Sequence, residues 1–154
     1  MSVSTTWQTS TTSAAETEAL AEKLGRALKG GEVIELVSDL GGGKTTFVRG
    51  MARGLGSTDR VASPTFTLSR VYGAGEHEIH HFDFYRLHEP GLIAEELADV
   101  LVDRHNIVVV EWADIVQDVL PKRRLTVHIT HAANGRSLTF RCPDALHYLI
   151  EAID

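Results

Sequence analysis

One cysteine, Cys142, is all that this sequence of 154 residues contains, so no disulfide can form within the chain. Long apolar runs are also missing: the longest, 107–110, is far shorter than the roughly 20 residues that cross a bilayer as a helix. The amino terminus, MSVSTTWQTSTTS, has neither the basic region nor the apolar stretch of a secretory signal. These absences predict a protein of the reducing cytoplasm that does not act at a membrane.

Positive charge is scarce as well. The sequence has 15 lysines and arginines against 21 acids, a net charge of −6, and its one basic cluster at 122–124 fits a solvated loop. Neutralising a nucleic-acid backbone needs a stripe of basic side chains. The composition therefore argues against direct, unaided binding of nucleic acid.

The length fits one domain, and neither a repeat nor a second domain is visible. Residues 1–12 are polar and are expected to form a flexible tail, which leaves 13–154 as the single domain. Ser13 and Glu16 have the spacing of a capping box and predict the start of a helix. The glycine pair at 30–31 is expected to end that helix.

Strands and helices are predicted to alternate along the domain. The apolar run at 107–110 suits a strand buried on both faces. Two hairpins are expected, one through the glycines at 73–75 and one around Asn134-Gly135. The pattern predicts an α/β fold whose mixed sheet is parallel in the middle and antiparallel at one side. The predicted strands are 33–37, 65–72, 77–84, 107–110, 125–130 and 137–142, and helices are expected to begin near residues 13, 44, 90 and 143.

A glycine-rich segment at 38–45 joins the first predicted strand to the second helix. It matches the P-loop pattern G-x-x-x-x-G-K-[ST], except that Ser38 replaces the first glycine. Because they carry no side chains, Gly41, Gly42 and Gly43 allow backbone amides to turn toward phosphate oxygens. A turn with an incidental lysine is the alternative, but the place of the segment between a strand and a helix favours phosphate binding.

The residues after these glycines predict how a nucleotide is held. Lys44 can reach the β- and γ-phosphates, and the Thr45 hydroxyl can ligate Mg²⁺. Thr46 follows where its hydroxyl or amide can meet the α-phosphate. The cradle predicts a P-loop NTPase-like three-layer sandwich that binds ATP with Mg²⁺.

A P-loop also needs a second acid to hold Mg²⁺ or its waters, at the end of an apolar strand. Glu111 directly follows the run at 107–110 and can in addition polarise an attacking water. Asp83 is the other candidate, on a predicted hairpin strand with Phe82 and Phe84 on the opposite face. For both acids a solvated place on the strand is the alternative.

Two further groups of residues have simpler interpretations. Thr65, in the Ser63-Pro64-Thr65 turn after the P-loop helix, is placed where a switch threonine would sense the γ-phosphate, although these residues taken alone favour an ordinary turn. His80 and His81 are adjacent on a strand and point to opposite faces, so a structural role is favoured over a shared metal.

Four phrases in this order and spacing resemble the TsaE (YjeE) family, the ATPase component of bacterial threonylcarbamoyladenosine modification of tRNA. The resemblance spans nearly the whole chain, and the combination of phrases is highly specific, although no single phrase is. The phrases are LGGGKTT at 40–46, SPTF at 63–66, HFDFYRL at 81–87 and VEWA at 110–113.

The resemblance implies a role for each matched residue. It assigns phosphate contact to Lys44. Ser38 departs from the family, which usually has glycine there, and affects the geometry of the loop. The implied roles are Mg²⁺ ligation for Thr45, a switch role for Thr65, acids near Mg²⁺ for Asp83 and Glu111, a place beside the site for Trp112 and one near the nucleotide for Arg136.

The resemblance also implies partners. These are a threonylcarbamoyltransferase subunit and its paralogous scaffold, of the TsaD and TsaB type, so that tRNA is met only indirectly. The expected activity is ATP hydrolysis that is weak alone and activated by these partners. The alternative is a small P-loop kinase, although no arginine-rich lid is apparent. A GTP switch is disfavoured because the sequence lacks Asn-Lys-x-Asp, and a non-hydrolysing adaptor is disfavoured by the strand-end acid at 111.

Overall fold

The computed structural model describes residues 4–39, 41, 43–64 and 68–154. A seven-stranded sheet runs through it in the order β1-β7-β6-β2-β5-β4-β3. The strands are β1 (Ser4–Thr11), β2 (Val33–Val37), β3 (Ser69–Ala74), β4 (His77–Asp83), β5 (Asn106–Glu111), β6 (Leu125–Ala132) and β7 (Gly135–Pro143). The helices are α1 (Ala14–Ala27), α2 (Lys44–Leu55), α3 (Gly91–Val102) and α4 (His147–Ile153), with short 3-10 turns η1 (Ala113–Val116) and η2 (Asp144–Leu146).

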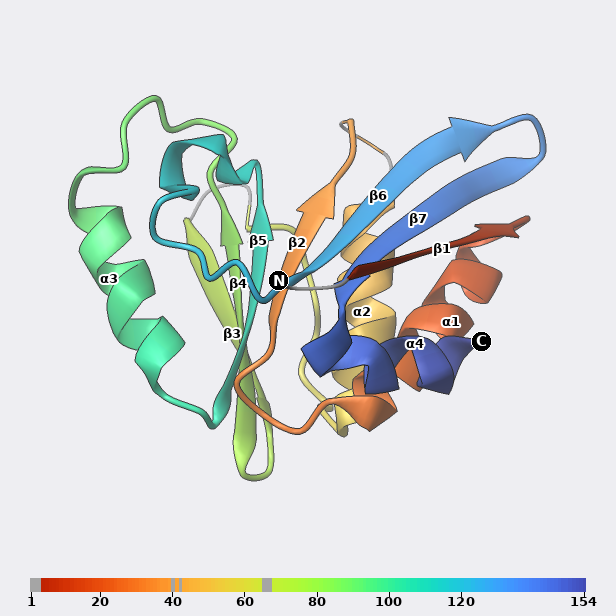
Figure 1. Ribbon diagram of the computed structural model, residues 1–154, viewed down its shortest axis with the longest axis horizontal. Coiled ribbons are helices and arrows are strands. Elements are labelled where there is room, and N and C mark those ends of the chain that lie inside the picture. The colour runs from red at the N-terminus through yellow and green to blue at the C-terminus, as the bar shows by residue number, and fades with distance from the viewer. Residues whose placement is uncertain (1–3, 40, 42, 65–67) are drawn as a thin grey trace.

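Helices cover both faces of the sheet, which confirms the three-layer α/β prediction (Figure 1). Two apolar clusters pack between the sheet and the helices, one on each face, so β2 and β5 are buried on both faces. One includes Phe47 of α2 and Ile34 of β2 and lies under α1, α2 and α4. The other includes Leu97 of α3 and Val110 of β5.

The parallel strands are the four in the middle, β6, β2, β5 and β4. The antiparallel hairpins flank them on both sides, β3 with β4 at one edge and β6 with β7 toward the other, rather than on one side only. The second hairpin turns through Ala133-Asn134, because Gly135 already pairs with Ala132. Gly135 approaches β1 so closely that a Cβ there would lie 1.9 Å from the Thr11 carbonyl oxygen.

The prediction of a flexible amino-terminal tail is wrong for residues 4–11, which form β1 along β7. The ladder is made by backbone groups, so the polar side chains of this segment give little sign of it. Trp7 adds the apolar contact, with its ring centroid 5.5 Å from that of Phe140. Residues 1–3 of the predicted tail lie outside the described part of the chain.

The capping box at the start of α1 is present in altered form. The Ser13 hydroxyl accepts a hydrogen bond of 3.1 Å from the Glu16 amide, as expected. The Glu16 carboxylate reaches back to the Thr12 amide instead of that of Ser13. In the part of the chain that is described, no helix is long and apolar enough to cross a membrane.

Candidate functional site

The predicted site residues gather at the carboxyl ends of the parallel strands, where open α/β sheets bind ligands. A pocket of about 290 Å³ opens there between the end of β5, the end of β4 and the start of α2. It is lined by Gly41, Gly43, Lys44, Thr45, Thr46, Ser63, Asp83, Glu111 and Trp112.

The loop from β2 to α2 depends on glycine at two described positions. Gly41 has φ of 75° and Gly43, the N-cap of α2, has φ of 100°, values that strain any residue with a Cβ. Ser38 is not among the residues with positive φ, so serine meets no backbone obstacle at the first P-loop position. The departure from the P-loop pattern is therefore compatible with the loop. Gly42 lies outside the described residues.

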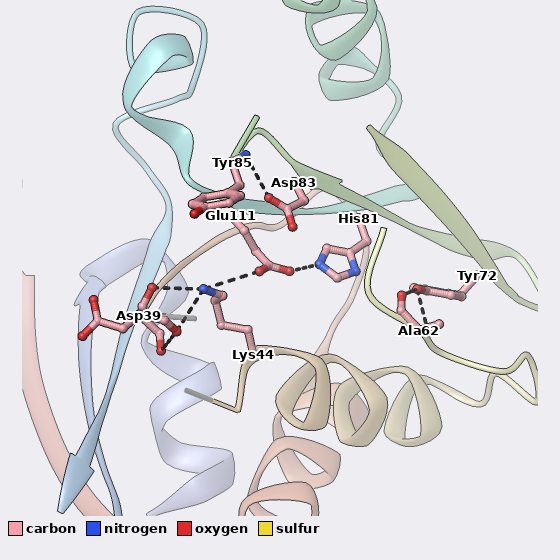
Figure 2. A network of polar contacts seen from close by, with 9 residues as sticks. Asp39, Lys44, Ala62, Tyr72, His81, Asp83, Tyr85 and Glu111 are labelled. Atoms are coloured by element: carbon pink, nitrogen blue, oxygen red, sulfur yellow. Dashed lines mark hydrogen bonds and ion pairs between the residues drawn. The ribbon is translucent and has the colours of Figure 1, made fainter. Parts of the chain in front are cut away.

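Lys44 occupies the first turn of α2 and is only 7% exposed. Its Nζ donates to the carbonyl oxygens of Ser38, at 3.0 Å, and Asp39, at 3.4 Å. It also lies 3.8 Å from Oε1 of Glu111 (Figure 2). The ammonium group is thus fixed at the wall of the pocket, beside an open helix amino terminus, as binding of a phosphate chain requires.

Glu111 ends β5 and is only 3% exposed, so it is not the solvated strand acid of the alternative interpretation. Its Oε1 faces Lys44 and its Oε2 contacts Nε2 of His81 (Figure 2). The sequence interpretation did not include His81 in the site. The available signal was its spacing from Asp83, because residues two apart on a strand share a face.

Asp83 lies directly opposite Glu111 in the parallel pairing of β4 with β5. Its Oδ1 accepts a hydrogen bond of 3.0 Å from the Tyr85 amide. Partial burial raises the pKa of the Asp83 carboxyl above its usual value, the Glu111 charge adds to this, and the Tyr85 amide opposes it. Binding of a cation would relieve the two neighbouring negative charges.

Trp112 lines the pocket, at the place where the sequence predicts it. Its backbone is left-handed, with φ of 54° and ψ of 51°, in the one described residue other than glycine with positive φ. Such a conformation costs on the order of 1–3 kcal/mol. The indole ring lies over Nζ of Lys44, 4.7 Å from the ring centroid, and contacts Tyr85 at 4.9 Å between centroids.

Arg136 and Thr46 both lie beside the P-loop. Nη2 of Arg136 lies 3.5 Å from the Gly41 carbonyl oxygen, so β7 places this arginine beside the P-loop. Both residues line a second, smaller pocket of about 130 Å³. Its other lining residues are Thr12, Ser13, Ala14, Thr17, Gly43 and Gly135.

One further predicted site residue is not brought into view, and no cluster of described residues marks the cation site. Thr65 lies outside the described residues, although Ser63 of the same segment lines the pocket. Among residues 4–39, 41, 43–64 and 68–154, no three His, Cys, Asp or Glu side chains gather as a metal cluster. A divalent cation could still be held by Thr45, Asp83 and Glu111 together with phosphate oxygens, as in P-loop proteins.

Comparison with known proteins identifies what the chain resembles. The family model described as threonylcarbamoyl adenosine biosynthesis protein TsaE matches residues 11–138. The tRNA threonylcarbamoyladenosine biosynthesis protein TsaE of Bacillus subtilis (strain 168) is 39% identical over 127 residues, covering 81% of this chain and 78% of that protein. Its namesake from Streptomyces coelicolor is 37% identical over 119 residues, covering 73% and 78%.

A solved structure has the same fold. The crystal structure of Bacillus subtilis YdiB superposes with a TM-score of 0.76 at 32% identity. The match covers 99% of this chain and 95% of that one.

Proposed function

This chain belongs to the TsaE family of tRNA threonylcarbamoyladenosine biosynthesis, and from that membership and the site we propose that it is the Mg²⁺-dependent ATPase subunit of that modification. The observation that carries the proposal is the pocket itself. One cavity at the carboxyl ends of the parallel strands is lined by a buried lysine, by the amino terminus of a helix that glycine caps, and by two carboxylates. This is the set of groups that phosphoryl transfer uses.

In the proposed complex the triphosphate lies over the start of α2. Amides of the loop and the Lys44 ammonium hold the β- and γ-phosphates, and Lys44 exchanges its carbonyl partners for phosphate oxygens. The smaller pocket lined by Thr46 and Arg136 adjoins the loop, and the nucleoside is proposed to extend toward it. The Trp112 ring stays in contact with the lysine ammonium group.

Hydrolysis then depends on the two acids. Bound Mg²⁺ supplies charge neutralisation on the phosphate oxygens. Thr45 and Asp83 would hold the ion or its waters, and Oε1 of Glu111, which faces the pocket, would accept a proton from the attacking water. Thr65 is proposed as the residue that senses the γ-phosphate.

One group that accelerates P-loop hydrolysis is not found among the described residues that line the pocket. None of the described residues that line it is an arginine, and Arg136 is placed beside Gly41 outside it. We therefore propose that cytoplasmic partners, the threonylcarbamoyltransferase and its scaffold of the TsaD and TsaB type, complete the site. tRNA would be bound by that complex, in keeping with the acidic balance of this chain.

The test is steady-state phosphate release by the purified protein, alone and then with both partner subunits from the same organism. A group supplied in trans accelerates P-loop hydrolysis on the order of 10³–10⁵-fold, so a slow basal rate and a large stimulation are expected. A basal rate near ~10 s⁻¹, a typical enzyme turnover, that ignores the partners would reject the proposal and favour a self-sufficient kinase.

A further inference from the structure

His81 contacts the proposed catalytic acid without being part of the pocket wall. It lies in the middle of β4, its side chain is fully buried, and its Nε2 meets Oε2 of Glu111 (Figure 2). Its neighbour across the sheet is Val109, two residues before Glu111, so the β4–β5 register brings the imidazole beneath the carboxylate.

The contact selects one tautomer of the ring. Nδ1 of His81 has no hydrogen-bond partner in the described part of the chain. A proton on that nitrogen would be a buried donor without an acceptor, which is costly. The proton therefore belongs on Nε2, where it is donated to Glu111, and Nδ1 remains an acceptor.

The Nε2 donor of His81 and the Lys44 ammonium group attract the Glu111 carboxylate in different directions. Lys44 lies 3.8 Å from Oε1 of Glu111, and both side chains are more than nine-tenths buried, where attraction between opposite charges is strong. Held only by Lys44, the carboxylate would turn both oxygens toward the ammonium group that the phosphates need. By binding Oε2, His81 keeps a single oxygen directed at the pocket.

The imidazole is itself fixed. The Tyr72 ring lies against it, with 6.3 Å between the ring centroids. The Tyr72 hydroxyl donates to the Ala62 carbonyl at 2.8 Å, so the segment just before Ser63 closes this side of the histidine (Figure 2). A rigid donor of this kind orients an acid more accurately than water could.

We infer that His81 is a positioning residue, which fixes the rotamer of Glu111 so that Oε1 faces the attacking water while Lys44 stays available to phosphate. The inference rests on the proposed ATP hydrolysis for its effect on rate, and on geometry alone for the tautomer and the contact. It assigns to the histidine no contact with the nucleotide.

The first experiment compares three variants in the partner-stimulated ATPase assay. His81→Leu removes the donor at similar size, and His81→Gln returns an N–H near the position of Nε2. His80→Gln is the matched control, because His80 is next in sequence and faces the other side of the sheet. Nucleotide affinity is measured by calorimetry and folding by thermal unfolding.

Positioning predicts a split between rate and affinity. Turnover in His81→Leu should fall about 10- to 100-fold, the usual effect of losing a partner that orients an active-site ligand. The Mg²⁺-ATP affinity should fall by a smaller factor, because Glu111 then competes with the phosphates for Lys44 while the other phosphate contacts remain. His81→Gln should recover most of the rate, and His80→Gln should match the wild type. Equal losses in both His81 variants, or a loss of affinity as large as the loss of rate, would overturn the inference.

The second experiment is independent of hydrolysis. Nitrogen-15 NMR of the imidazole should show the proton on Nε2, protected from exchange, with a marked shift in Glu111→Gln and none in Glu32→Gln. A proton on Nδ1, or a signal that ignores the change at Glu111, would refute the contact. If the wild type releases no phosphate with its partners while this signal is as expected, the proposed function fails and the inference is confined to the geometry of Glu111.

Discussion

Two buried glutamates at opposite ends of the parallel strands are held in opposite ways. Glu32 and Glu111 are each 3% exposed, the first just before β2 and the second at the end of the adjacent β5. Glu32 accepts hydrogen bonds of 2.7 Å from the amides of Lys29 and Gly30 and of 2.6 Å from the Tyr148 hydroxyl. All three of its donors are neutral groups.

Glu111 has a charged partner instead, the Lys44 ammonium group, in addition to the neutral donor His81. Both glutamates line pockets, so facing a pocket does not distinguish them. A carboxylate satisfied by fixed neutral donors ties elements together, here the α1–β2 turn to α4, and leaves no oxygen for a ligand. A carboxylate with one partner that can exchange its contacts, as Lys44 can, keeps an oxygen available for chemistry. The kind of donor, and not the depth of burial, therefore separates the structural acid from the functional one.

The difference between Glu111 and Glu32 is tested most directly by making the same substitution, glutamate to glutamine, at both positions. Glu111→Gln keeps the shape but removes the base, and general base catalysis contributes typically about 10²–10⁴-fold, so partner-stimulated phosphate release should fall by that factor. Glu32→Gln should leave the rate unchanged and instead lower the free energy of unfolding by about 1–3 kcal/mol, because a donor loses its charged acceptor. Phosphate-release assays and urea unfolding of both variants test this. A rate loss in Glu32→Gln with an unchanged rate in Glu111→Gln would show that Glu32, and not Glu111, is the functional acid.

The two lysines near these acids give the next largest contrast. Lys44→Ala should weaken Mg²⁺-ATP binding by about 30-fold or more, since truncating one partner of a buried charged contact costs roughly 2–5 kcal/mol. Lys29 lies over the Tyr148 ring, 4.2 Å from its centroid, at the far end of the sheet, and Lys29→Ala is the matched control. Calorimetric titration should show unchanged affinity for the control. Equal affinities in Lys44→Ala and the wild type would remove the lysine from the site.

The amino-acid sequence predicts the residues around Glu111 and the P-loop but does not predict the hydrogen bonds of Glu32. The strand–glycine–lysine pattern is local, so the amino-acid sequence alone is enough to predict the places of Lys44, Thr45 and Glu111. Nothing local marks Glu32, because its hydroxyl donor comes from Tyr148, 116 residues away along the chain. Long-range partners of this kind follow only from the packed fold.

The same distinction explains the elements that sequence reasoning found and missed. Short continuous apolar runs predict β2 and β5, and apolar residues at helical spacing predict the long helices, because the burial of these elements depends on the type of their own side chains. β1 is polar and is held through its backbone to β7, so its residues read as a tail. The spacing of His81 from Asp83 puts both on one face of β4, but the contact with Glu111 also required the register between β4 and β5, which the sequence does not reveal.

Tyr148→Phe sharpens the comparison from the structural side. Loss of the hydroxyl should lower the free energy of unfolding by about 1.5–3 kcal/mol, the usual range for a hydrogen bond to a charged group. Tyr85→Phe, on an exposed ring, is the control and should change little. Burial, and then the bond to Glu32, raise the pKa of Tyr148, so the folded protein keeps this proton longer than the unfolded chain does.

The sign of that shift gives a pH test of the same bond. Stability from the Tyr148 hydroxyl is complete at neutral pH and is lost as the pH rises above about 10, where unfolded tyrosine ionises. The difference between wild type and Tyr148→Phe, measured by urea unfolding, should therefore shrink above that pH. A difference that is constant up to strongly alkaline pH would show that the hydroxyl does not carry the effect.

The smallest expected effect is a change in the free energy of unfolding at Asp83, which has the opposite sign to the change expected at Glu32. Because the pKa of Asp83 is raised, the folded state binds this proton more tightly than the unfolded chain does. That contribution is present at pH below the ordinary value of about 4 and is lost as the pH rises through the raised value, so at neutral pH the ionised group opposes folding. Asp83→Asn removes the charge and keeps an acceptor for the Tyr85 amide.

Asp83→Asn should therefore stabilise the nucleotide-free protein slightly, by less than about 1 kcal/mol, while raising the Mg²⁺ concentration that hydrolysis needs. The matched control is Asp114→Asn, on the exposed part of η1, which should alter neither property. Glu32→Gln moves stability in the opposite direction, because Glu32 is stabilised by its surroundings and Asp83 is not. If Asp83→Asn instead destabilised the protein as Glu32→Gln does, Asp83 would belong with the structural acid, and the pocket at the carboxyl ends of the strands would have Glu111 as its only described functional carboxylate.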